Sequence, residues 1–197
     1  MKLKEMKIKV FSLIEEYYPE ETTLAEDEDV KNKINGVINQ IQMDLMPLRK
    51  IEASTDIEIT SSDDRKIDLK DYLDSLYQID RIYFEDDVDY EMLNSTTILL
   101  PDDFDGTFTV YYYKYPKLCK LEFESEEESA EYDESYKFEL DNDLLEAMPY
   151  GIAADLLKMD MISNYGQYFY NRYLELKQRI DSRRSSGSIR ITGGAKI

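Results

Sequence analysis

The sequence predicts an α+β fold in which helical segments at both ends of the chain enclose an antiparallel β-rich region. Apolar residues recur every three or four positions in residues 1–50 and again in residues 141–181, as on one face of an α-helix. Between them, in residues 51–140, apolar and polar residues alternate in short runs, which is typical of half-buried strands. We expect residues 1–181 to form a single domain, an antiparallel helical bundle with this β-rich insertion, followed by an extended arm over residues 182–197.

The first 50 residues are predicted to form two antiparallel helices. Pro19 ends the first helix, because proline lacks the amide hydrogen that a helix interior requires. Thr23 can cap the second helix, with Glu26 three residues later in capping-box spacing, and Pro47 marks its end. The apolar stripes that these helices should bury are Leu3, Met6, Val10, Leu13, Tyr17, Val30, Ile34, Val37, Ile41 and Leu45.

Strand signals begin after residue 50. Apolar and polar residues alternate in residues 56–60 and 76–84, and a short apolar run covers residues 98–100. Residues 107–115 give the strongest signal, because they are rich in Thr, Val, Phe and Tyr, and Pro116 ends this run. The middle of the chain is therefore predicted to be mainly antiparallel sheet.

The segment between these strands and the last helix is strongly acidic. Residues 124–134 carry seven acidic residues, and we interpret them as a solvated loop. Just before it, the single cysteine, Cys119, lies between Leu118 and Lys120 in an apparent strand. We interpret this cysteine as a small core residue and not as a nucleophile.

The last large element is predicted to be a long helix. It begins over residues 141–148, is interrupted by Pro149, and continues over residues 152–180 as one helix, roughly 40 Å long at 1.5 Å per residue. Such a helix is longer than the core of a small domain. Its aromatic second half is therefore predicted to contact another subunit, with ordinary core packing as the alternative. The predicted interface residues are Tyr165, Tyr168, Phe169 and Tyr173.

The composition argues against catalysis. The chain has no histidine, which removes the side chain best suited to proton transfer near neutral pH and a common metal ligand. Asp86, Asp87 and Asp89 could hold a metal ion, but a solvated turn is the preferred interpretation, since calcium loops need a defined ligand spacing. There is no glycine-rich phosphate loop. We expect no catalytic residue, no metal site, no cofactor and no enzymatic activity.

Charge and hydropathy limit the partners. No apolar run approaches the roughly 20 residues of a membrane-spanning helix, and residues 1–9 alternate charged and aliphatic residues instead of forming a signal peptide, so we expect no membrane association. The net charge of −19 disfavours stable binding to a phosphate backbone. Any contact with DNA should therefore be transient.

The C-terminal arm has the opposite charge. Residues 182–197 contain four basic residues and no acidic one. Within the arm, a five-residue segment alternates like a strand that lacks a sheet, and we expect it to add to an exposed sheet edge on a partner, with two isoleucines filling pockets. A disordered tail is the alternative. The residues of this predicted binding segment are Ser188, Ile189, Arg190, Ile191 and Thr192.

Four short stretches follow one another in a distinctive order. They are Asn35–Met43 in the second helix, Tyr111–Pro116 at a strand end, Phe138–Leu140, and Leu144–Ala154 in the last helical region. In this combination the chain, over residues 3–181, resembles the bacteriophage head-to-tail connector family, the tail adaptor or head-completion subunits that dock under the portal ring.

The resemblance implies a structural virion protein, assembled in the host cytoplasm. It would form a homo-oligomeric ring, commonly a dodecamer, between portal and tail around the DNA exit channel. Its partners would be the portal protein and a tail protein or second adaptor, with the arm at residues 188–192 reaching the portal. Acidic side chains facing the channel would repel DNA phosphates, although they could equally serve to keep a free subunit soluble.

Two other functions fit the composition. An acidic protein could inhibit a basic partner, such as a nucleic-acid enzyme, by mimicking DNA. Binding of that kind should weaken as ionic strength rises, whereas apolar packing and strand addition should persist. A magnesium-dependent nuclease using aspartate clusters is the third possibility, and the absence of activity with Mg²⁺ or Mn²⁺ would remove it.

Overall fold

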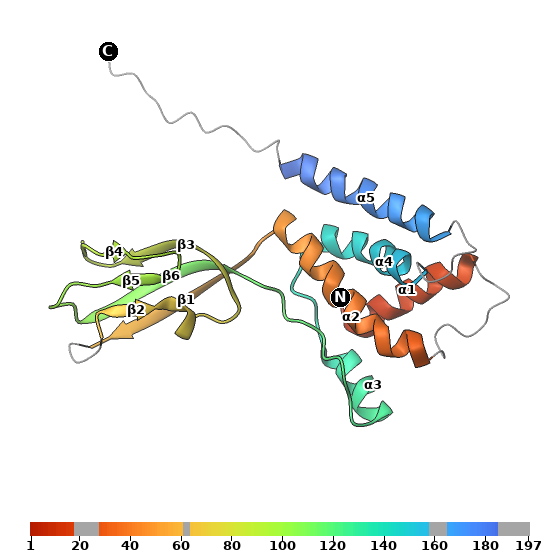
Figure 1. Cartoon of the computed structure of the whole chain (residues 1–197), viewed down its shortest axis with the longest axis horizontal. Coiled ribbons are helices and arrows are strands. Elements are labelled where there is room, and N and C mark those ends of the chain that lie inside the picture. The colour runs from red at the N-terminus through yellow and green to blue at the C-terminus, as the bar shows by residue number, and fades with distance from the viewer. Residues whose placement is uncertain (18–27, 61–63, 158–164, 185–197) are drawn as a thin grey trace, which may run out of the picture. The chain divides into compact units, whose positions relative to one another are not determined.

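The protein has a mixed α+β fold whose residues form two compact units (Figure 1). The computed structural model describes residues 1–17, 28–60, 64–157 and 165–184. The sequence predicts one domain over residues 1–181, whereas the structure divides into a helical unit and a sheet unit. Of the described residues, the helical unit comprises those within 1–48, 119–137 and 141–184, and the sheet unit comprises those within 49–118 and 138–140.

The helical unit is organised around a central helix. Its helices are α1 (Leu3–Tyr17), α2 (Glu28–Leu45), α3 (Glu126–Ser135), α4 (Asn142–Leu157) and α5 (Tyr165–Arg184), and a short 3₁₀ turn, Met46–Leu48, follows α2. Helices α1, α2 and α5 all pack against α4, and α3 packs against α1. The two helices predicted near the N-terminus are confirmed, while the predicted cap at Thr23 and the stop at Pro19 lie outside the described residues.

Apolar side chains from each of these helices form the core of the helical unit. At two positions the buried residue is the one after the residue predicted. Ile14 is buried while Leu13 is half-buried in α1, and Ile38 is buried while Val37 is half-buried in α2. Each fully buried aliphatic side chain contributes about 1.5–3 kcal/mol relative to exposure. Gly151 lets α2 and α5 approach α4, since a Cβ there would lie 3.1 Å from side-chain atoms of Ile41 and Tyr173.

The C-terminal region contains two helices instead of one long helix, which corrects the prediction for residues 152–180. Helix α4 ends at Leu157 and α5 packs back along it in the antiparallel direction, with Gly166 beside Leu157 and Tyr173 beside Gly151. The predicted interruption at Pro149 is also wrong, because α4 runs through this residue. Proline usually interrupts a helix, but Pro149 is buried inside α4, and α1, α2 and α5 all pack against this helix. We attribute the tolerance of this proline to that packing.

The acidic segment is a helix and not a solvated loop. Ser125 caps α3 by accepting a hydrogen bond from the Glu128 amide at 3.2 Å, and three glutamates in the first turn complement the helix dipole. Lysines of α1 offset the acidic charge of its last turn: Lys7 pairs with Asp133 at 2.7 Å, and Lys4 pairs with Glu134 at 2.5 Å. Charge pairing across two helices therefore stabilises a segment whose composition favours a loop.

The sheet unit contains two three-stranded antiparallel sheets (Figure 1). The first has the order β1-β6-β3 and the second the order β2-β5-β4. The strands are β1 (Ile51–Ile59), β2 (Lys66–Asp68), β3 (Leu76–Phe84), β4 (Glu91–Met92), β5 (Thr97–Leu99) and β6 (Gly106–Lys114). The predicted strands at residues 56–60, 76–84, 98–100 and 107–115 are confirmed, with shifts of a few residues at their ends.

Alternation along β6 defines an inner and an outer face of the first sheet. Phe108, Val110 and Tyr112 are buried in the core of the sheet unit, so the residues between them lie on the outer face. Strand β1 pairs with β6 in continuous register from Ile51 opposite Lys114 to Ile59 opposite Gly106. Strand β3 pairs with the other side of β6, but its register shifts twice. Its alternation therefore changes along the strand.

Side-chain amides of α2 hold the extended segment that returns to the helical unit. Asn39 makes two hydrogen bonds with the backbone of Cys119: its amide nitrogen donates to the carbonyl at 2.9 Å and its oxygen accepts from the amide at 2.7 Å. One turn earlier, Asn35 donates to the carbonyl of Lys120 at 2.8 Å. One turn later, Gln42 is fully buried and exchanges hydrogen bonds with the Tyr136 hydroxyl. Asn35 and Asn39 therefore replace hydrogen-bond partners that the backbone of the segment would have in a sheet.

Replacing Asn39 with alanine should destabilise the protein by about 1–3 kcal/mol, because the buried backbone groups of Cys119 lose their partners. Asn39→Asp should fall between wild type and Asn39→Ala, since a carboxylate can accept from the Cys119 amide but cannot donate to its carbonyl. Urea unfolding followed by circular dichroism measures both. Gln40→Ala, an exposed position on the same helix, is the control and should change stability by less than about 0.5 kcal/mol. Equal effects at residues 39 and 40 would contradict this role.

Candidate interaction surfaces

The described residues contain no arrangement suited to metal binding. Among them, no group of three or more His, Cys, Asp or Glu side chains converges as metal ligands. Burial raises the pKa of the Cys119 thiol to about 11, so this cysteine stays protonated and unreactive at neutral pH. No helix in the described part of the chain has the length and apolar content needed to cross a bilayer.

The predicted interface residues on α5 fall into two groups. Phe169 and Tyr173 are 0% and 3% exposed, so they belong to the core of the helical unit, in agreement with ordinary core packing, the alternative to a subunit interface. Tyr165 and Tyr168 are 40% and 51% exposed. These two tyrosines are three residues apart, which places them on the same side of the helix. They are the part of the predicted interface that is accessible to a partner.

The buried side of α5 is fixed to α2 by a charged cluster. The Tyr173 hydroxyl donates to the Asp44 carboxylate at 2.5 Å, and Lys177 donates to both carboxylate oxygens at 2.7 Å. Burial alone would raise the pKa of the Asp44 carboxyl, but the hydrogen bonds from Lys177 and Tyr173 lower this pKa below its ordinary value. The cluster therefore ties one side of α5 to the C-terminal end of α2.

A groove lies along strand β3 in the sheet unit. It has a volume of about 420 Å³, and its lining follows β3 from Leu76 to Ile82 and includes Tyr90, Met92, Ser95 and Thr96 from the β4 region. This volume is within the range of about 300–1,000 Å³ usual for ligand sites. Strand β3 is at the edge of its sheet and β4 is at the edge of the other, so the groove runs between two sheet edges.

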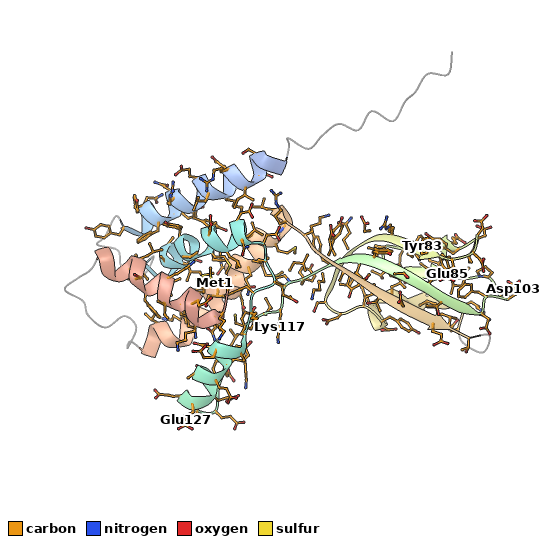
Figure 2. All side chains as sticks on the ribbon, turned by 180° about the vertical axis from the view of Figure 1, so that it is seen from behind. Met1, Tyr83, Glu85, Asp103, Lys117 and Glu127 are labelled. Carbon is orange, nitrogen blue, oxygen red and sulfur yellow. The ribbon has the colours of Figure 1, made fainter. Side chains whose placement is uncertain are left out.

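Much of the acidic charge is solvent-exposed. Glu127 projects from the first turn of α3, Glu85 follows β3, and Asp103 lies in the turn before β6 (Figure 2). These three side chains are exposed, as are Asp86 and Asp87. In contrast, the acidic residues in the last turn of α3 are paired with lysines. The exposed acids are spread over both units instead of converging on one site.

The predicted binding segment, residues 188–192, lies outside the described residues. Comparison with known proteins finds no family model and no curated protein that matches the chain. The groove along β3 was not predicted from the sequence. It depends on register shifts in β3 and on the course of residues 85–96, which strand periodicity does not reveal.

Replacing Asp44 with asparagine should reduce stability by about 1 kcal/mol at neutral pH, a value limited by the partial exposure of the pair. The folded pKa of Asp44 is lowered, so its contribution is fully present above the ordinary value of 3.8 and is lost as pH falls through the folded pKa. The difference in unfolding free energy between wild type and Asp44→Asn should therefore shrink below pH 3.8. Glu175→Gln, at the exposed partner of Arg172 on α5, is the control and should have little effect. A pH-independent difference would contradict this assignment.

The two groups of α5 aromatics should respond differently to substitution. Tyr165→Ser combined with Tyr168→Ser should change stability by only about 0.5 kcal/mol per site, as expected at the surface, while weakening self-association. Phe169→Ala should destabilise the fold by about 3–5 kcal/mol through a core cavity. Thermal unfolding and sedimentation velocity separate the two effects. If the double serine variant associates like wild type, these tyrosines are not part of an interface.

Proposed function

We propose that this chain is a structural adaptor of the head-to-tail connector class, which forms a ring between portal and tail and carries out no catalysis. The observation that best supports the proposal is the two-sided character of α5. One side is fixed in the core through Phe169 and Tyr173, and another side presents Tyr165 and Tyr168 to solvent. Tyrosine is enriched in protein interfaces, where its ring buries apolar area and its hydroxyl stays hydrogen-bonded.

The order of the units along the chain is consistent with this class. The helical unit begins before residue 49 and resumes after residue 118, and the sheet unit occupies most of the interval. The connector resemblance implies the same organisation, a helical bundle with a β-rich insertion and an extended C-terminal arm. A closed ring requires heterologous contacts, in which two different surfaces of one subunit meet. The exposed tyrosines of α5 would supply one of these surfaces.

The acidic surface suits a protein that surrounds passing DNA. With 43 acidic and 24 basic residues, the subunit repels phosphates at short range, which would prevent DNA from adhering to the channel. The alternative function, inhibition of a basic partner by DNA mimicry, needs a dense and unpaired acidic surface. The densest acidic segment, α3, has Asp133 and Glu134 paired with Lys7 and Lys4 of α1, which favours the adaptor over the mimic.

Mixing the protein with its cognate portal protein should give stacked rings in negative-stain electron microscopy. Because apolar packing holds these contacts, the complex should persist when NaCl is raised from 0.15 M to about 0.5 M, where the Debye length falls from about 8 Å to less than 5 Å. A DNA mimic should instead bind a basic protein and dissociate over the same salt range. The Tyr165→Ser and Tyr168→Ser double variant is the matched control and should form fewer rings. Failure to bind the portal at any salt concentration would reject the adaptor function.

A further inference from the structure

The groove along β3 has the features of a site for an extended peptide. Its two sides are the edges of different sheets, and among the described residues no strand pairs with the outer edge of β3. An edge strand presents backbone donors and acceptors that an added strand can satisfy. The register shifts between Leu76 and Gln78 and between Ile79 and Arg81 leave extra residues outside the regular ladder with β6. The groove therefore combines free backbone groups with a shaped cavity.

The two faces of the groove differ in polarity. Ile79, Ile82 and Tyr90 are half-buried and pack against the core of the sheet unit. Asp80 lies on the outer side, because its carboxylate accepts a hydrogen bond from the hydroxyl of Tyr113, an outer-face residue of β6, at 3.3 Å. A strand lying in the groove would place alternate side chains toward the apolar interior and toward this carboxylate. The fitting peptide has aliphatic residues at every second position and a cation between them.

The charge around the groove selects a basic peptide. Residues 76–96, which form or connect the two strands that border it, carry six acidic residues and one basic residue. The basic residue, Arg81, is already placed over the ring of Tyr111 at 4.3 Å. An acidic groove attracts a cationic segment and repels an acidic one. Since most of this chain is acidic, few of its own segments could be accepted.

One segment of the chain has the required pattern. In Ser188–Thr192, Ile189 and Ile191 alternate with Arg190, and residues 182–197 contain four basic residues and no acidic one. We propose that the groove along β3 of one subunit binds residues 188–192 of a second copy as an added strand, with both isoleucines facing the apolar interior and Arg190 near Asp80. The proposal rests on the ring assembly proposed above. It gives the arm a neighbouring subunit as its partner in place of the portal.

Direct binding tests this assignment. The receptor is the full chain carrying Ile189→Asp and Ile191→Asp, so that its own arm cannot compete, and the probe is a fluorescent peptide of residues 185–197. Fluorescence anisotropy should show saturable binding, and a peptide carrying the same two substitutions should bind at least tenfold more weakly. Absence of saturable binding overturns the proposal.

Receptor variants locate the bound peptide. Met92→Asp and Asp80→Lys alter exposed groove residues and should each weaken peptide binding at least tenfold. Met43→Asp on α2 and Asp56→Lys on β1 are matched controls at exposed positions outside the groove, and they should bind the peptide as the parent receptor does. If the groove variants bind normally, or the controls lose binding equally, the peptide sits elsewhere and the proposal is wrong.

A crosslink identifies which copy supplies the arm. The full chain carrying Asp80→Cys and Arg190→Cys is prepared in light and heavy isotopic forms, mixed, oxidised and analysed by mass spectrometry. The proposal predicts disulfide-linked peptides that pair a light with a heavy copy. Links within single copies only, or no link between residues 80 and 190, overturn it. This result is independent of the adaptor function: crosslinked copies that do not bind a portal would reject the function alone, and stacked rings without the link would reject the arm exchange alone.

Discussion

The helical unit depends on satisfying the backbone of a non-helical segment packed against a helix. Residues 119–120 cross the surface of α2 without a strand partner, and their polar groups would lose hydrogen bonds on burial. The Asn39 side chain donates a hydrogen bond to the Cys119 carbonyl and accepts one from the Cys119 amide. The Asn35 side chain donates a hydrogen bond to the carbonyl of Lys120. Because α2 also packs on α4, this amide row fixes the return of the chain relative to the central helix. The positions of α3 and of Tyr136 follow from that attachment.

Local pairing determines how this acidic protein tolerates its charge. The net charge of −19 favours expansion of the chain through self-repulsion, yet several acids of the helices have nearby cations. Lysines of α1 face the end of α3, and Lys177 faces Asp44. Each such pair is exposed enough to be worth little alone, so their value is in orienting helices whose apolar contacts supply most of the stability. The unpaired acids are left on surfaces where they can act on a partner.

Much of the fold could be predicted from periodicity, because burial imposes repeats of 3.6 and 2.0 residues on the sequence. Helices α1 and α2 and strands β1, β3, β5 and β6 followed from those repeats. The prediction failed where tertiary contacts outweighed local preference. Pro149 lies inside α4 because its surroundings are apolar, and residues 126–135 are helical because lysines distant in sequence pair with their acids.

For the candidate surface on α5, helical spacing in the sequence could be used to select residues, but their exposure depends on contacts between helices. Helical spacing selected the aromatic residues of α5, but it could not separate Tyr165 and Tyr168 from Phe169 and Tyr173. Which of these residues are buried depends on how α5 packs antiparallel to α4. The sequence pattern did not predict this packing, because its apolar periodicity continues from α4 into α5.

The first sheet has two edge strands, β1 and β3, whose charge limits what can pair with them. An open edge is a liability for a soluble protein, and natural sheets protect such edges with charge, bulges or short strands. Here β1 carries Glu52, Asp56 and Glu58 on its exposed face, and β3 has two register shifts and a following acidic segment. These features disfavour pairing between like edges, since two acidic edges repel one another. They do not exclude a basic strand, because an acidic edge attracts a segment of opposite charge.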